Sequence, residues 1–201
     1  MDQVQVSIEL PAWLASLTAG PAPLPGSSDA ERMQWAIELA ARNVAEGTGG
    51  PFAAIVVDET TGLYTAAGVN LVVASGLSIA HAEAIAIMLA QQRAGNFDLA
   101  GDPQKRYSLY ATGQPCIMCF GILWWSGITK LVCAARGEDV ERITGFREGP
   151  LQEHWPQLLS ERRDLPIEVV RDVNRAAACD VLSAYKAAGH LVYNPGSTVS
   201  E

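Results

Sequence analysis

The sequence has few basic residues for its length. Fourteen Lys and Arg residues stand against 22 Asp and Glu residues, which gives a formal net charge of −8. Proteins that follow a phosphate backbone usually carry a basic stripe. The nearest approach to one here is "KR" at 105–106 and "ERR" at 161–163, and both are too short. The sequence therefore argues against a nucleic-acid partner.

Long apolar runs are also missing, and no stretch approaches the roughly 20 residues that cross a bilayer. The opening "MDQVQVSIEL" has an early acid and no basic flank before an apolar run, unlike a secretory signal. We therefore expect a cytoplasmic protein without membrane association. There is no internal repeat and no low-complexity tract, and 49% of the 201 residues are apolar. This composition predicts one compact domain over residues 1–201.

The chain alternates between strand-like and helix-like segments. A proline-rich N-terminal extension is expected over 1–28, and Ser28 with Glu31 forms a capping-box pattern that starts a helix. Strands are predicted at 52–59, 64–73, 107–112, 130–135 and 167–170, and helices at 29–46, 80–93, 116–127 and 174–188. An initial hairpin followed by strand–helix repeats predicts a three-layer α/β/α fold with a mixed sheet. Ligands in such folds collect at strand ends where helices begin.

Cysteine is scarce, with four residues in the whole chain, and two of them are Cys116 and Cys119. This number and spacing suit metal or thiol chemistry better than a disulfide scaffold. Cysteines three apart at a helix start can point to one ion, and His81, at the start of another predicted helix, offers a third ligand. Three such ligands leave a fourth position for water, which is typical of catalytic zinc. We expect one zinc ion per subunit, with a bound water.

Glu83 lies two residues after His81 in the apolar segment "IAHAEAIAIM". A carboxylate beside zinc-bound water can accept its proton and pass it to a substrate. Each element has an ordinary explanation when taken singly: a redox or accidental CxxC, a buried histidine, or an acid at a helix N-terminus. Their combination, H-x-E followed by P-C-x-x-C, is the signature of zinc deaminases that act on bases.

At these motifs the chain resembles the cytidine deaminase-like superfamily and, within it, bacterial guanine deaminases. The resemblance runs from about Asp29 to Tyr193 and includes "GGPFAAIVV" at 49–57, "GVN" at 68–70 and "PCIMCFGILWWSG" at 115–127. The sequence departs from many relatives at Gln114, where glutamate is common, and at Ala53, where glycine is common. These departures affect the surroundings of the metal ligands and the room in the pocket.

The resemblance implies a set of substrate contacts in addition to the catalytic Glu83. Asn70 would bind polar ring edges, Phe52 would pack on the flat base, and Glu148 would recognise a purine or shuttle a proton. Each also has an ordinary reading, as a turn asparagine, a core aromatic and a solvated loop acid. The full set of expected substrate contacts is Phe52, Asn70, Ala82, Trp125, Glu148 and Tyr193. The tail over 189–201, which carries Tyr193, is expected to close over a site, either its own or that of a partner in a homodimer.

The expected reaction is hydrolytic deamination of a small-molecule base, guanine to xanthine and ammonia. Close alternatives are a triazine such as ammeline, or cytosine or cytidine, because small pocket changes decide between these rings. A tRNA adenosine deaminase would need an extruded base and a phosphate-binding surface, which the acidic composition does not favour. A zinc-stabilised or thiol-switch protein without turnover is the non-enzymatic alternative.

Overall fold

The computed structural model describes residues 5–20, 22–23 and 28–196. Parts of the expected extension (1–4, 21 and 24–27) and of the expected tail (197–201) lie outside the described residues. Within the described chain one six-stranded sheet has the order β1-β3-β2-β4-β5-β6. The strands are β1 (Ala22–Pro23), β2 (Ala53–Asp58), β3 (Leu63–Val69), β4 (Tyr107–Gly113), β5 (Lys130–Ala135) and β6 (Glu168–Val170).

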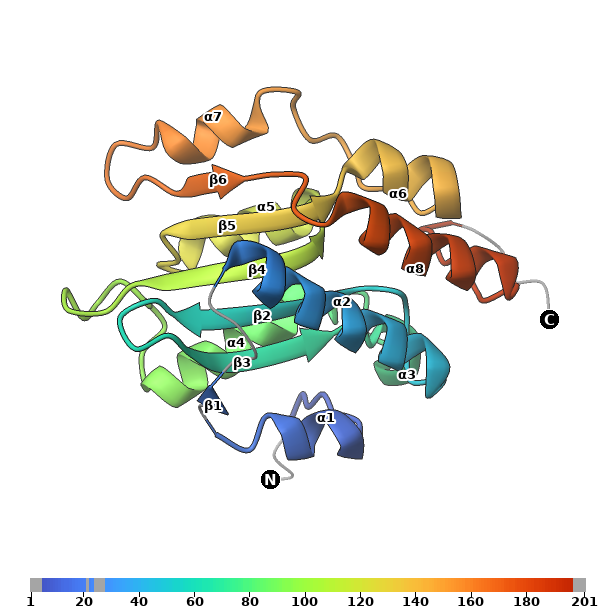
Figure 1. Ribbon diagram of the computed structural model, residues 1–201, viewed down its shortest axis with the longest axis horizontal. Helices are drawn as coiled ribbons and strands as arrows, with labels where there is room; N and C mark the ends of the chain where they lie inside the picture. The colour runs from blue at the N-terminus through green and yellow to red at the C-terminus, as the bar shows by residue number, and fades with distance from the viewer. Residues whose placement is uncertain (1–4, 21, 24–27, 197–201) are drawn as a thin grey trace.

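The sheet is mixed, as predicted. β2 is antiparallel to both β3 and β4, whereas β4, β5 and β6 run parallel. Helices cover both faces, so the predicted three-layer α/β/α architecture is confirmed. Figure 1 shows α2 (Asp29–Ala45) and α8 (Arg175–Ala187) in front of the sheet, and α4 (Ala82–Ala94) and α5 (Ile117–Trp125) behind it. The remaining described helices are α1 (Ala12–Leu17), α3 (Val72–Ser75), α6 (Gly137–Thr144) and α7 (Trp155–Ser160).

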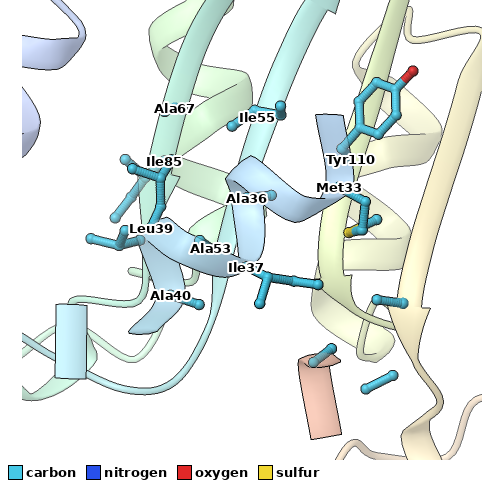
Figure 2. Close-up of a cluster of buried hydrophobic side chains, with 14 of the residues drawn as sticks. Met33, Ala36, Ile37, Leu39, Ala40, Ala53, Ile55, Ala67, Ile85 and Tyr110 are labelled. Atoms are coloured by element: carbon cyan, nitrogen blue, oxygen red, sulfur yellow. The ribbon is translucent and has the colours of Figure 1, made fainter. Parts of the chain in front are cut away.

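The core follows from helical spacing on α2 and from two-residue alternation in the sheet. Ser28 caps α2 in a capping box with Glu31, as predicted. Met33, Ala36 and Ile37 then pack over β2 and β4 (Figure 2). Along β2, Ile55 faces α2 and Val56 faces α4, and both are fully buried because each face of the sheet is covered.

The predicted second strand ends earlier than expected, at Val69 instead of Val73. Asn70 Oδ1 accepts a hydrogen bond from the Val72 N–H at 3.3 Å, which turns the chain into the short helix α3. The prediction was wrong here because the apolar pattern does not register a turn formed by a side chain. The elements α1, β1, α3, α6 and α7 were also not predicted. The described part of the N-terminal extension covers the edge strand β3, where Ala22 pairs with Tyr64, and inserts Leu14 into the core.

The strand directions bring the ends of five elements together on one side of the sheet, where strands begin or end. The start of β2 and the ends of β3 and β4 meet there, since Ala53 pairs with Val69 and Ala54 with Ala111. Helices α4 and α5 begin on the same side, after His81 and Cys116. Among the residues that the structure describes, no helix has the length and hydropathy of a membrane span.

Candidate active site

Two helix starts hold the three predicted metal ligands. His81 is the N-cap of α4 and Cys116 the N-cap of α5, both with extended backbones, and Cys119 lies in the first turn of α5. The His81 Nδ1 atom is 3.5 Å from Cys116 Sγ and 3.6 Å from Cys119 Sγ. Tetrahedral zinc, with bonds of about 2.3 Å to sulfur and about 2.0 Å to nitrogen, separates such atoms by about 3.6 Å. The donor set therefore fits zinc without rearrangement.

The three ligand side chains also shift one another's pKa values. A hydrogen bond from the Cys119 thiol lowers the pKa of Cys116 to about 4, with a further contribution from His81. The same hydrogen bond and burial raise the pKa of Cys119 far above its usual range. Burial by itself lowers the pKa of His81, but its hydrogen bond with Cys116 and the charge of Glu83 raise that pKa overall. One thiol thus keeps the proton that stabilises the other, and a divalent ion bound to both would replace it.

Glu83 is directed at this cluster from the first turn of α4. Its side chain is buried, with 9% of the residue exposed, and it lines the same cavity as His81 and Cys116. Burial raises the pKa of the Glu83 carboxyl, and the neighbouring Cys116 thiolate raises it further. A carboxylate with a raised pKa is a better proton acceptor, as general base chemistry near neutral pH requires.

His81, Cys116 and Glu83 form the floor of a cavity of about 680 Å³ at the ends of the strands, and the fully buried Cys119 lies outside the cavity lining. One wall is aromatic. The centroid of the Phe146 ring lies 5.7 Å from that of Phe52 and 5.0 Å from that of Tyr193, and the rings meet edge to face in both pairs. Three aromatic side chains, from the residue directly before β2, from the loop after α6 and from the C-terminal tail, therefore meet around one space. Such a wall suits a flat ring.

The polar wall consists of Asn70 and Glu148. The Asn70 Nδ2 group donates to the Tyr193 hydroxyl at 2.7 Å, so the tail is tied to Asn70 within the same chain. The Glu148 side chain lines the cavity from the loop at 145–149, and burial raises the pKa of its carboxyl to about 8, with Cys116 and Glu83 adding to the effect. An amide and a carboxyl that line one cavity offer both donors and acceptors to a heterocycle.

Two expected substrate contacts lie elsewhere. Trp125 is the last residue of α5, is 78% exposed and does not line the cavity. Trp125 therefore does not reach the cavity of its own chain, because helical rotation from Cys119 carries position 125 to the outer face, and its expected substrate contact stays a prediction. Ala82 is buried against β3, where its carbonyl would be 2.3 Å from a Cβ placed on Gly68, and it too is absent from the cavity lining.

Sequence reasoning missed several cavity residues. Phe146 and Arg147 precede Glu148 in "GFREGP", and Asn194 and Pro195 follow Tyr193. Their closeness to residues already singled out was an available signal, because neighbours in a loop that enters a site commonly line it. Ser78 and Thr112 carried no such signal.

The fold and the site together define a class of protein: an α/β/α zinc hydrolase with a buried carboxylate beside a His-Cys-Cys cluster. The chain belongs to the family described as cytidine and deoxycytidylate deaminase zinc-binding region, whose model matches residues 27–135. The predicted superfamily and the zinc cofactor are confirmed by this match and by the clustering of the three ligands.

Individual similar proteins give a more specific comparison than the family model. The guanine deaminase of Bacillus subtilis (strain 168) is 36% identical over 127 residues, which cover 63% of this chain and 76% of the relative. The guanine deaminase structure from Nitrosomonas europaea is 42% identical with a TM-score of 0.84, covering 91% of this chain and 97% of that one. A mutant protein in complex with 8-azaguanine superposes with a TM-score of 0.86 at 40% identity, covering 94% and 99% of the two chains.

Proposed function

We propose that this protein is a zinc-dependent aminohydrolase that converts free guanine and water to xanthine and ammonia. The observation that carries the proposal is the buried Glu83 beside the His81, Cys116 and Cys119 cluster, at the floor of a cavity with an aromatic and a polar wall. The names of the relatives support guanine over other rings, since two of them are guanine deaminases and a third structure holds a guanine analogue.

His81, Cys116 and Cys119 would hold the zinc ion. When bound, zinc lowers the pKa of a coordinated water from about 15.7 toward 7 and so supplies a nucleophile at neutral pH. Glu83 accepts the proton of the attacking water and delivers it to a ring nitrogen as the new C–O bond forms at C2. Proton transfer to the exocyclic amino group then lets the C–N bond break, and ammonia leaves.

The cavity walls orient the ring for this attack. The Asn70 carboxamide donates to and accepts from polar edges of the base, and Phe52 packs against its face. Glu148, whose pKa is raised by burial, donates a hydrogen bond to the ring in its protonated form or passes a proton to the departing amine. Tyr193 closes the cavity over the substrate and limits the access of bulk water.

We further propose that residues 1–201 act as one deaminase domain. The sheet takes β1 from the N-terminal segment, and the cavity takes Tyr193 from the C-terminal segment, so both ends of the described chain belong to one structure. We also propose a cytoplasmic location, which is supported by four cysteines that form no disulfide with one another.

A homodimer is the proposed assembly, with α5 at its interface. Its sequence "IMCFGILWW" is entirely apolar or glycine, yet only Cys119 and Leu123 are buried, and Ile117 and Trp125 are exposed by 45% and 78%. An apolar helix face of this kind, left uncovered by its own chain, marks an interaction surface. A second copy is the proposed occupant, because Ile117 and Met118 also line the cavity and a copy packed there would shield its mouth.

The experiment that tests the function is ammonia release by the zinc-loaded protein across a substrate panel. The panel contains guanine, cytosine, cytidine, ammeline and a tRNA with a wobble adenosine, and the Glu83→Gln variant is the control for contaminating activity. We expect guanine to give the highest kcat/KM. A higher kcat/KM for another ring would overturn the substrate, and a stable zinc protein without any turnover would overturn the enzymatic proposal.

A further inference from the structure

Asn70 stands directly after β3, outside the ladder hydrogen bonds of the sheet. Three hydrogen bonds nevertheless fix its position besides the one to Tyr193. Its N–H donates to the Phe52 carbonyl at 3.0 Å, its side-chain oxygen accepts from the Val72 N–H, and its own carbonyl accepts from Asn43 Nδ2 at 3.0 Å. The last of these comes from a residue that does not line the cavity.

Asn43 lies in the last turns of α2 and is 0% exposed. Both hydrogens of its amide are used, because Nδ2 donates to the Gly50 carbonyl at 2.8 Å as well as to Asn70. Its Oδ1 accepts from the Thr48 hydroxyl at 2.7 Å, and that hydroxyl in turn accepts from the Trp13 indole at 3.3 Å. Asparagine is a poor helix former. The fully hydrogen-bonded amide at this buried helical position therefore stabilises the contact between Gly50 and Asn70 rather than the helix itself.

The loop before β2 packs closely against the same two residues, Asn43 and Asn70. A Cβ at Gly49 would lie 1.9 Å from the Asn70 carbonyl oxygen and 2.8 Å from Asn43 Nδ2. A Cβ at Gly50 would lie 3.1 Å from Asn70 Oδ1. Because neither glycine has a Cβ, the chain at 49–50 can approach Asn70 closely. Asn43 can therefore donate to the Gly50 and Asn70 carbonyls at the same time.

We propose that Asn43 is a positioning residue for substrate recognition: it clamps Gly50 and Asn70 and thereby sets the direction in which the Asn70 carboxamide enters the cavity. The inference rests on the proposed function for the role of Asn70 at the substrate. Asn43 acts only through Asn70, so its contribution disappears when the Asn70 carboxamide is absent. A displacement of about 1 Å in a substrate contact can lower a rate about 100-fold. We expect the loss of Asn43 to displace the Asn70 carboxamide by less than this and to lower the rate by a smaller factor.

A double-mutant cycle tests the coupling. The values of kcat/KM are measured for the wild type, Asn43→Ala, Asn70→Ala and the double variant, with the ring of the panel that the wild type deaminates. We expect Asn43→Ala to lower kcat/KM by about 10-fold or more in the wild-type background and by less than about 2-fold beside Asn70→Ala. Equal losses in the two backgrounds would show that Asn43 has only a general structural role.

Two further variants separate positioning from folding. Asn43→Asp keeps the shape but removes both donors. Thr48→Val removes the hydrogen bond that orients the Asn43 side chain, together with the bond from the Trp13 indole, but leaves both Asn43 donors in place. Both variants should therefore lower kcat/KM, Thr48→Val less. The matched control is Ser126→Ala, which loses the buried hydrogen bonds to Leu123 and Ile128 away from the cavity. We expect it to leave kcat/KM within about 2-fold of the wild type.

A structural readout decides the inference even if the wild type deaminates no ring of the panel. The NMR signals of the Asn70 side-chain amide, assigned by their loss in Asn70→Ala, should shift in the soluble Asn43 variants or in Thr48→Val and stay in place in Ser126→Ala. Unshifted Asn70 signals in those variants would overturn the proposal, whatever the outcome for the function.

Discussion

Glu83 is the side chain on which the proposed chemistry depends most directly. Glu83 is not one of the three metal ligands, so its carboxylate can be replaced without removing a ligand of the zinc ion. We expect Glu83→Gln to retain zinc and to lower kcat by about 10²- to 10⁴-fold, because the amide cannot accept the proton of the attacking water. Steady-state ammonia release and zinc content per chain measure the two effects. Activity within a few-fold of the wild type in a zinc-loaded Glu83→Gln protein would refute its role.

Phe146 joins the aromatic wall to the core, since its ring contacts Phe52, Tyr193 and Tyr185 and only 5% of the residue is exposed. We expect Phe146→Ala to lower the free energy of unfolding by about 3 kcal/mol and to raise KM, because the cavity loses an aromatic wall. Phe146→Leu is the matched variant, with a smaller loss of stability and a partly restored KM. Denaturant unfolding and steady-state kinetics check both. An unchanged KM in Phe146→Ala would place the ring outside the substrate's reach.

Helix α6 sets the position of the loop that carries Glu148, because it ends at Thr144, directly before Gly145, the first residue of that loop. Asp139, in its first turn, is held by the Arg175 side chain of α8 at 2.7 and 2.9 Å and by the Arg136 N–H at 3.1 Å. The hydrogen bonds from Arg175 hold the pKa of Asp139 well below its usual range. Ionised Asp139 therefore stabilises the pairing of α6 with α8.

The pH dependence of that pairing follows from the sign of the shift. A carboxyl whose pKa is lower in the folded protein stabilises it fully above the unfolded pKa of about 4, and the contribution is lost as the pH falls through the folded value. We expect Asp139→Asn to lower the free energy of unfolding by about 1–2 kcal/mol at pH 7. The difference between variant and wild type should shrink below about pH 4, as measured by denaturant unfolding at pH 7 and pH 3. A difference that is equal at both pH values would contradict this account.

Elements with strong local signals were predictable from the sequence. The buried strands, α2 with its capping box and the two helices at the metal motifs lie within one or two residues of their expected positions. The strand expected to run to Val73 failed because the Asn70 side chain ends it, and a propensity pattern contains no such hydrogen bond. Helix α6 carried Glu138 and Asp139 in its first turn and Gly145 at its end, signals that were present in the sequence but not used.

The zinc ligands and Glu83 were predictable because two short motifs carry all four residues. The aromatic wall, by contrast, joins Phe52, Phe146 and Tyr193, which are separated by most of the chain, and only the strand order brings them together. The sequence does contain one signal for Asn43: it is a polar residue at the same helical spacing as Met33, Ala36 and Ala40, on the buried face of α2. Its partners, the Gly50 and Asn70 carbonyls, are backbone atoms that no residue pattern identifies.

Trp125, which was expected to contact the substrate and lies outside the cavity of its own chain, bears on the assembly of the molecule. The residue ends an apolar helix whose outer face is open in the single chain, so a second copy on α5 would bury it. We expect the wild type to sediment at twice the chain mass of 21.4 kDa and Trp125→Glu to sediment as a monomer, because a buried unpaired carboxylate is costly. The matched control is Phe97→Glu, which changes an aromatic that is 83% exposed on the loop after α4 and should leave the dimer intact. Sedimentation velocity on the zinc-loaded proteins distinguishes the outcomes. A monomeric wild type, or a dimer that Phe97→Glu and Trp125→Glu affect equally, would remove α5 as the interface.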